Sequence, residues 1–121
     1  MLKKIIDKNC IISIFNNLVF KSFKTRRIFF LLPKKDCLRG GHAHKKCTQI
    51  FFSIKGNFKI KIFNGKKVKE KIITPTTKGL VVRPMNWVDL ELKRGNVCMV
   101  LCDRKFEEND YIRNIEKFKK N

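Results

Sequence analysis

The sequence predicts an all-β protein, a sandwich or a barrel, and two observations support this prediction. Most apolar segments are short and rich in β-branched and aromatic residues, such as TQIFFSI and NVCMVLC, which is the usual composition of strands. Glycine, proline and an Asn-Gly turn separate these segments at intervals of about ten residues, a spacing typical of sandwiches and barrels. We therefore expect antiparallel strands rather than alternating strands and helices.

The separate elements follow from the same pattern. Strands are expected in CIISIF, RRIFFLL, TQIFFSI, GLVVRP, WVDLEL and NVCMVLC. The clearest hairpin is NFKIKIFNGKKVKEKII, where Phe58, Ile60 and Ile62 alternate with lysines before the Asn-Gly turn, as in a hairpin with one wet face.

Only the C-terminal end has a helical pattern. In NDYIRNIEKFKKN, Ile112, Ile115 and Phe118 recur at helical spacing, and Asp110 stands where a capping residue is expected. We therefore predict a short C-terminal helix that follows a β-fold.

Length and charge limit the organisation of the protein and its partners. The 121 residues suit a single domain spanning 1–121. Lysine and arginine number 29 against 10 acidic residues, so the net charge is +19, which suggests an anionic partner. Because the lysines are spread over every segment, we favour a solvated basic surface suited to an anionic small substrate over a nucleic-acid groove.

Two features of the chain indicate its compartment. No apolar run approaches the roughly 20 residues that span a bilayer, and the N-terminal stretch has no signal-peptide pattern. The five cysteines are odd in number and contain no C-x-x-C pair, as expected for reduced thiols. We expect a cytoplasmic protein in which Cys98 and Cys102 pack within a strand.

Both histidines lie in the segment LRGGHAHKKCTQ, one residue apart. Residues i and i+2 of a strand point to the same side, so His42 and His44 would face one place, which in a barrel can be the interior. The preceding Gly-Gly step permits unusual backbone angles, and Arg39 and Lys45 add positive charge suited to an anionic ligand. The pair could be metal ligands, proton carriers, or merely two polar residues in a loop.

A metal site is the less favoured of these interpretations. Zinc and iron sites usually need three or four protein ligands, and the chain has no third histidine. Gln49 offers only a neutral amide, and although Asp89 and Glu91 could supply oxygen ligands, no spacing demands it. We therefore predict that no metal is bound for catalysis.

The residues around the pair resemble a known family. HAHKKCTQIFFSIKG resembles the first cupin motif, H-x-H-x4-[E/Q]-x6-G, while GLVVRPMNWVDL keeps the glycine and proline of the second motif but lacks its histidine. Together with RGGHAHK, P-x-x-W and DYIR, the chain resembles, from about residue 24 to 118, the sugar 3,4-ketoisomerases of dTDP-6-deoxyhexose biosynthesis.

This resemblance implies a fold, an assembly and a reaction. The fold would be a cupin, a small double-stranded β-helix or jelly roll, commonly a homodimer that exchanges N-terminal segments, here about residues 1–23. The enzyme would be an isomerase without metal or organic cofactor. It would convert a dTDP-4-keto-6-deoxyhexose into the 3-keto isomer, which an aminotransferase then uses to make a 3-amino-3,6-dideoxy sugar.

Moving the ketone requires a proton to leave C3 and another to reach C4 through an enediol, which suits a histidine base. We predict that His44 is the main acid/base and that His42 polarises an oxygen of the enediolate. Arg39 and Lys45 would hold the diphosphate, since arginine offers a planar fork and lysine a point charge.

Further candidate residues are less firmly placed. Trp87 could stack on thymine or instead belong to the core, and Arg83 is a weaker phosphate ligand. Gln49 would bond within the pocket. The resemblance implies an active-site tyrosine in the strand RRIFFLL, where the matching position is Phe30.

Two residues near the C-terminus are expected to have a structural role: Arg113 and Asp110 would fasten the C-terminal helix.

Two other functions compete with the isomerase interpretation. One is a nucleic-acid-binding β-barrel that uses the high charge for phosphate contacts. The other is a cupin that binds a nucleotide sugar without converting it.

Overall fold

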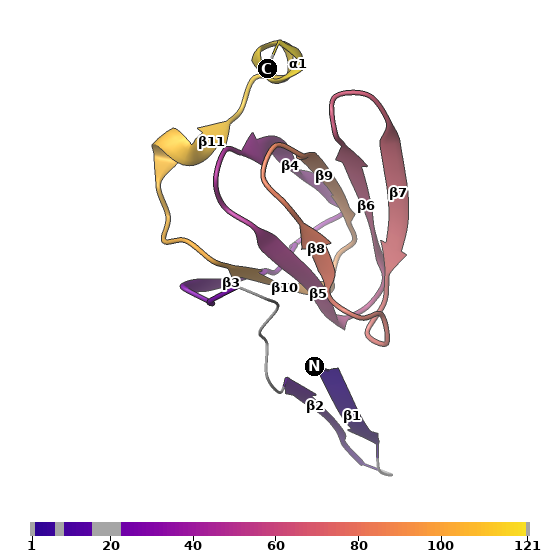
Figure 1. Ribbon diagram of the computed structural model, residues 1–121. Coiled ribbons are helices and arrows are strands. Elements are labelled where there is room, and N and C mark those ends of the chain that lie inside the picture. The colour runs from indigo at the N-terminus through magenta and orange to yellow at the C-terminus, as the bar shows by residue number, and fades with distance from the viewer. Residues whose placement is uncertain (1, 7–8, 16–22, 121) are drawn as a thin grey trace.

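The computed structural model, which describes residues 2–6, 9–15 and 23–120, confirms the all-β prediction (Figure 1). A four-stranded sheet has the order β3-β10-β5-β8, and a five-stranded sheet has the order β11-β4-β9-β6-β7. The described elements are β1 (Leu2–Ile6), β2 (Ile11–Phe15), β3 (Arg27–Leu31), β4 (Cys37–His44), β5 (Gln49–Lys55), β6 (Phe58–Phe63), β7 (Val68–Ile73), β8 (Leu80–Val82), β9 (Trp87–Leu92), β10 (Val97–Cys102), a 3₁₀ turn (Glu108–Asp110), β11 (Tyr111–Ile112) and α1 (Ile115–Lys119).

The main core lies between the two sheets. Phe51 and Val100 of the four-stranded sheet pack against Ile60, Val88 and Leu90 of the five-stranded sheet, and all five side chains are buried. Each belongs to a strand whose alternate residues face outward, so the period-2 pattern of the sequence directly builds the sandwich. The expected hairpin is confirmed, because β6 and β7 pair antiparallel with Phe58 opposite Ile73.

The outward side of the four-stranded sheet carries a second apolar cluster. Ile50, Phe52 and Leu101 are buried there, and Phe15 of β2 packs its ring edge against Phe52 with 5.1 Å between ring centroids. The hairpin of β1 and β2 is a separate two-stranded sheet that lies at the end of the molecule away from α1 (Figure 1). It therefore contacts the sandwich without extending either sheet.

The C-terminal helix is shorter than predicted. Ile112 belongs to β11, which pairs with β4, and the helix begins only at Ile115. Asn114 caps it, accepting hydrogen bonds from the backbone N–H groups of Glu116 and Lys117. The prediction that Asp110 is the cap is wrong, since its carboxylate is used elsewhere. In the part of the chain described here, no helix has the length and apolar character to cross a membrane.

Candidate active site

The histidine pair lies at a cavity between the two sheets, with a volume of about 180 Å³. Side chains from both sheets and from the segment after the 3₁₀ turn line it: Phe29, Leu31, Arg39, Gly40, His42, Gln49, Phe51, Val88, Leu90, Tyr111 and Arg113. His44 lies beside this lining, with its ring edge-on to His42 and 5.1 Å between centroids. The pair therefore meets at the interior of the sandwich, as the sequence pattern indicated.

The Gly-Gly step makes this placement possible. At Gly40 the backbone has φ +88°, and a Cβ atom would lie 2.6 Å from the carbonyl oxygen of Val88 on the neighbouring strand. The pairing of β4 with β9 shifts register between Gly40 and His42, which is a β-bulge. Only glycine fits this close approach, and the bulge re-aims the strand just before the histidines.

His44 is held by a buried carboxylate. Its Nδ1 lies 2.8 Å from Oδ2 of Asp110, and both side chains are almost fully buried. The other oxygen, Oδ1, accepts a hydrogen bond of 2.7 Å from the backbone N–H of Lys46. A carboxylate bonded to one imidazole nitrogen fixes the proton there, so Nε2 of His44 is left as the basic nitrogen, and it has no hydrogen-bond partner in the described structure.

Burial keeps both imidazoles neutral near pH 7. It lowers the pKa of His42 to about 4, with further lowering from the neighbouring His44 ring and the guanidinium groups of Arg113 and Arg27. Burial also lowers the pKa of His44, although Asp110 opposes it through its hydrogen bond and its charge. Neutral imidazoles are competent bases.

The sole tyrosine lies against both histidines. The Tyr111 ring is 4.9 Å from that of His42 and 4.3 Å from that of His44, measured between centroids. Its hydroxyl accepts a hydrogen bond of 3.3 Å from Nη1 of Arg27, and the Arg113 guanidinium lies over its ring at 4.2 Å. A hydroxyl and two cations thus surround the imidazoles.

The two arginines differ in their acidic partners. Arg113 forms a bidentate ion pair with Glu108, at 2.7 and 3.0 Å. Arg27 forms no ion pair with a carboxylate within the described ranges, and its Nε is buried without a partner. Of these two arginines, Arg27 is therefore the one without a carboxylate partner among the described residues.

Of the predicted site residues, the structure brings His42, His44, Arg39 and Gln49 together. Gln49 bonds within this region, as expected, because its Nε2 donates to the sulfur of Cys102 at 3.4 Å. Cys102 itself is buried in β10, as predicted for a packed thiol.

Other predicted residues lie outside the cavity. Phe30 is 53% exposed on the outward side of β3, and its neighbour Phe29 lines the cavity. Trp87 packs in the core with Phe118, which is the alternative already considered for it. Lys45 and Arg83 are exposed and line other hollows.

Sequence reasoning missed Asp110, Tyr111 and Arg27 as neighbours of the pair. Asp110 and Arg113 were assigned to fastening the helix, but Asp110 bonds His44 and Arg113 bonds Glu108. The motif DYIR was the available signal. Placing it beside HAH would have required the pairing of β11 with β4, in which Tyr111 lies opposite His44.

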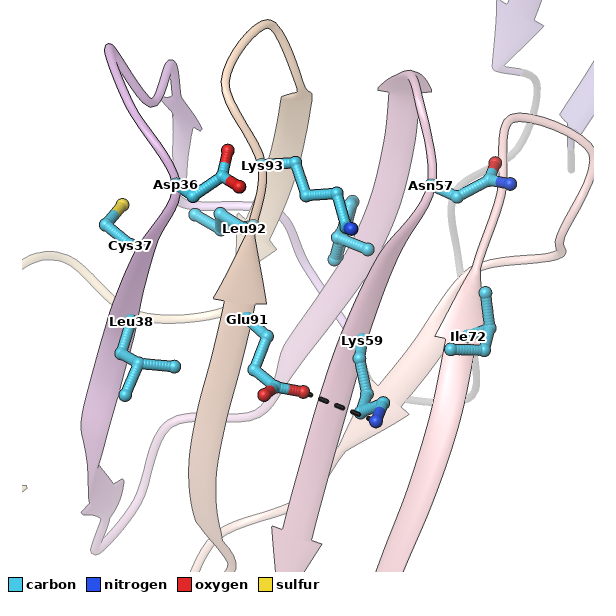
Figure 2. A pocket seen from close by; sticks show the side chains of 10 residues that line it. Asp36, Cys37, Leu38, Asn57, Lys59, Ile72, Glu91, Leu92 and Lys93 are labelled. Atoms are coloured by element: carbon cyan, nitrogen blue, oxygen red, sulfur yellow. Dashed lines mark ion pairs between the residues drawn. The ribbon is translucent and has the colours of Figure 1, made fainter.

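A larger hollow, of about 620 Å³, lies on the outward side of the five-stranded sheet (Figure 2). Leu38, Glu91, Lys59 and Ile72 from four neighbouring strands line it, and Lys59 pairs with Glu91 at 3.5 Å. Neither histidine reaches it. Because it holds no imidazole and its Lys59 is paired with Glu91, its volume does not make it the candidate active site.

Comparisons with known proteins agree with this geometry. The family described as "FdtA: WxcM-like, C-terminal" matches residues 1–121. A TDP-4-oxo-6-deoxy-alpha-D-glucose-3,4-oxoisomerase from Aneurinibacillus thermoaerophilus is 31% identical over 121 residues, covering 98% of this chain and 86% of the relative.

Two solved structures are similar over almost the whole chain. WlaRA, a TDP-fucose-3,4-ketoisomerase from Campylobacter jejuni, has a TM-score of 0.83 and 29% identity, with 98% of this chain and 89% of that one covered. QdtA, a sugar 3,4-ketoisomerase from Thermoanaerobacterium thermosaccharolyticum solved with TDP, has a TM-score of 0.87 and 27% identity, with 98% and 88% covered. This chain is therefore an isomerase that belongs to the FdtA family, together with the TDP-sugar 3,4-ketoisomerases.

Proposed function

We propose that this protein converts a dTDP-4-keto-6-deoxyhexose into the dTDP-3-keto isomer, which then serves the synthesis of a 3-amino-3,6-dideoxy sugar. The observation that carries the proposal is a pair of neutral imidazoles beside a cavity with cationic walls, His44 buried and backed by Asp110 and His42 half-buried. The names of the relatives support the substrate class, because both the curated relative and the solved structures act on TDP-linked sugars.

His44 is the acid/base in this proposal. Its Nε2 would take the proton from C3 to give an enediol and return a proton to C4. The ketone thereby moves from C4 to C3, and the sugar is neither oxidised nor reduced overall. Asp110 would hold the ring orientation and stabilise the imidazolium that forms between the two transfers. A dedicated orienting carboxylate is a frequent companion of a catalytic histidine.

The other groups would stabilise charge. His42 lines the cavity and would polarise an oxygen of the enediolate. Arg27 and the Tyr111 hydroxyl to which it donates form a second polar group beside the rings. Arg39, which is exposed at the cavity wall, would bind the diphosphate through its planar fork.

Incubation of the protein with dTDP-4-keto-6-deoxyglucose tests the proposed reaction directly. After treatment with EDTA and gel filtration, the protein should still form the 3-keto sugar, because no step uses a metal, and a proton NMR time course would follow the product. In heavy water deuterium should appear at C4. The proposal fails if the sugar is unchanged, or if activity is lost on EDTA treatment and restored by one metal.

A competition experiment tests the alternative function. Random single-stranded DNA should not compete with dTDP for binding, whereas a nucleic-acid-binding barrel would prefer the DNA.

We also propose that the chain is a cytoplasmic homodimer joined through its N-terminal segment, of which residues 1, 7–8 and 16–22 lie outside the described structure. The five cysteines, all within the described part, form no disulfide, which suits a reducing compartment. Ile5, Ile6 and Ile12 of the hairpin are exposed, and so are Ile28, Phe30 and Leu32 along the edge strand β3. Two such surfaces are a liability unless another chain covers them.

Phe30→Lys is therefore expected to shift the dimer toward monomer, because a charge would be placed under the partner's hairpin. Val68→Lys is the matched control, since Val68 is equally exposed on the edge strand β7 of the other sheet. Sedimentation equilibrium at micromolar concentration measures both. A wild-type monomer, or a chain lacking residues 1–15 that remains dimeric, would contradict the proposed exchange.

A further inference from the structure

Three potential metal ligands of different chemistry meet around His44. One ligand atom each from His44, Cys47 and Asp110 lies within 4.8 Å of the other two. All three side chains are more than nine-tenths buried, with exposures of 4%, 1% and 7%. Nδ1 of His44 lies 2.8 Å from Oδ2 of Asp110, so an imidazole nitrogen, a carboxylate and a thiol meet in this cluster.

The local fold explains why the thiol arrives there. The loop after β4 wraps around Asp110, whose backbone oxygen accepts the N–H of Lys45 and whose Oδ1 accepts the N–H of Lys46. These two bonds fix the next residue, Cys47, beside the carboxylate and beside His44. The Cys47 thiol takes no part in the proposed proton transfer.

An imidazole, a thiolate and a carboxylate together form a ligand set typical of zinc. Zinc–ligand bonds of 2.0–2.3 Å place the ligand atoms of a tetrahedral site about 3.3–3.8 Å apart, so separations of up to 4.8 Å require only small side-chain rotations. Lys45 and Lys46 line the hollow outside Asp110, where Arg104 is already paired with Glu107 at 3.0 Å. The charge of the two lysines would disfavour hard dications. Only an ion that gains strongly from thiolate ligation is expected to enter.

We propose that His44, Cys47 and Asp110 form an inhibitory binding site for Zn²⁺. Binding converts the Cys47 thiol to a thiolate, and the displaced proton passes to solvent. The ion takes the Nδ1 lone pair of His44 and a carboxylate oxygen of Asp110, and the proton that Nδ1 carried moves to Nε2, so the ring loses both its basic lone pair and its orienting partner. The inhibitory part of this inference rests on the proposed function, whereas the binding part does not.

Cobalt(II) tests the binding independently of activity. The EDTA-treated full-length protein is titrated with CoCl₂, and a thiolate-to-cobalt charge-transfer band together with the intense visible bands of tetrahedral cobalt should appear at one equivalent. ZnCl₂ should abolish both bands, and MgCl₂ should not. A protein without isomerase activity would still show the bands, so failure of the proposed function is distinguishable from failure of this site.

Cys47→Ser and Cys47→Ala should lose the charge-transfer band and weaken Zn²⁺ binding by at least about tenfold. Cys37→Ser is the matched control, because Cys37 lies at the larger hollow away from the cluster and should leave the band intact. Both Cys47 variants should keep isomerase activity but need at least about tenfold more Zn²⁺ for half inhibition. Circular dichroism verifies their fold, and serine and alanine together separate loss of the ligand from a packing defect.

The proposal is overturned if wild-type protein gives no thiolate band, or if folded Cys47 variants bind cobalt as the wild type does. Metal bound through His42, His44 and Gln49 would give that second result, because no sulfur takes part. Inhibition that persists unchanged in both Cys47 variants would likewise remove Cys47 from the site.

Discussion

Replacing His44 by asparagine is expected to slow isomerisation by about 10²–10⁴-fold while the affinity for dTDP stays unchanged. Asparagine retains polarity and most of the side-chain volume, and its amide can still donate toward Asp110. It has no titratable nitrogen, however, so the proton carrier is lost. Steady-state rates with the dTDP-ketosugar and calorimetric titration with dTDP would separate turnover from binding.

His42→Asn provides the comparison within the same cavity. His42 lines the wall and bonds to no carboxylate in the described part of the chain, so we expect a smaller loss of rate, from weaker stabilisation of the enediolate. If His44→Asn isomerises the substrate at the wild-type rate, the proton-carrier assignment is wrong. If the His42 variant is the slower of the two, the two histidines exchange roles.

Most of the fold could be predicted because its signals are local. The alternation of Phe58, Ile60 and Ile62 with lysines fixes which side of β6 is buried, and the Asn-Gly turn fixes the hairpin register. The histidine pair was equally local, since two positions of one strand share a side without any knowledge of neighbouring strands. The bulge at Gly40 decides which side that is. Before it Arg39 lies opposite the inward-facing Leu90, and after the extra residue His42 lies opposite the inward-facing Val88, so the bulge turns the pair toward the cavity.

The rest of the site depends on contacts between distant residues. Asp110 and His44 are 66 positions apart, and nothing in the spacing of either segment indicates that β11 pairs with β4. The same pairing takes Ile112 out of the expected helix, because its backbone bonds to a strand rather than to the next turn. At Ile112, strand pairing with β4 therefore determines the backbone conformation, although the spacing of apolar residues favours a helix.

The orientation of Phe30 could not be predicted from the sequence for a different reason. RRIFFLL is apolar at every position from Ile28 to Leu32, so its sequence does not show which alternate set faces inward. Pairing with β10 settles the question by placing Phe29 opposite the buried Val100. A run that is apolar on both sides leaves the register to its partner strands.

Asp110→Asn tests the contact that the sequence did not reveal, and it should lower the rate of isomerisation by about 10²–10⁴-fold, comparable to the loss of His44 itself. The backbone N–H of Lys46 needs an acceptor, so the amide oxygen should remain there and the amide NH₂ should face Nδ1 of His44. That NH₂ can only donate, which forces the histidine proton onto Nε2 and removes the basic lone pair.

The pH dependence distinguishes this positioning role from simple destabilisation. The hydrogen bond and charge of Asp110 raise the pKa of His44 against the larger lowering by burial; without them, the pKa falls further. Because a base works only when deprotonated, wild-type activity should fall on acidification through that pKa, and the residual activity of Asp110→Asn should fall only at a lower pH. Asp103→Asn is the matched control. Oδ1 of Asp103 accepts a hydrogen bond of 2.9 Å from the backbone N–H of Thr48, just as Oδ1 of Asp110 accepts one from Lys46. None of the described contacts joins Asp103 to an imidazole. The control should keep the wild-type rate and pH profile, and an equal loss in both variants would show that Asp110 merely supports its loop.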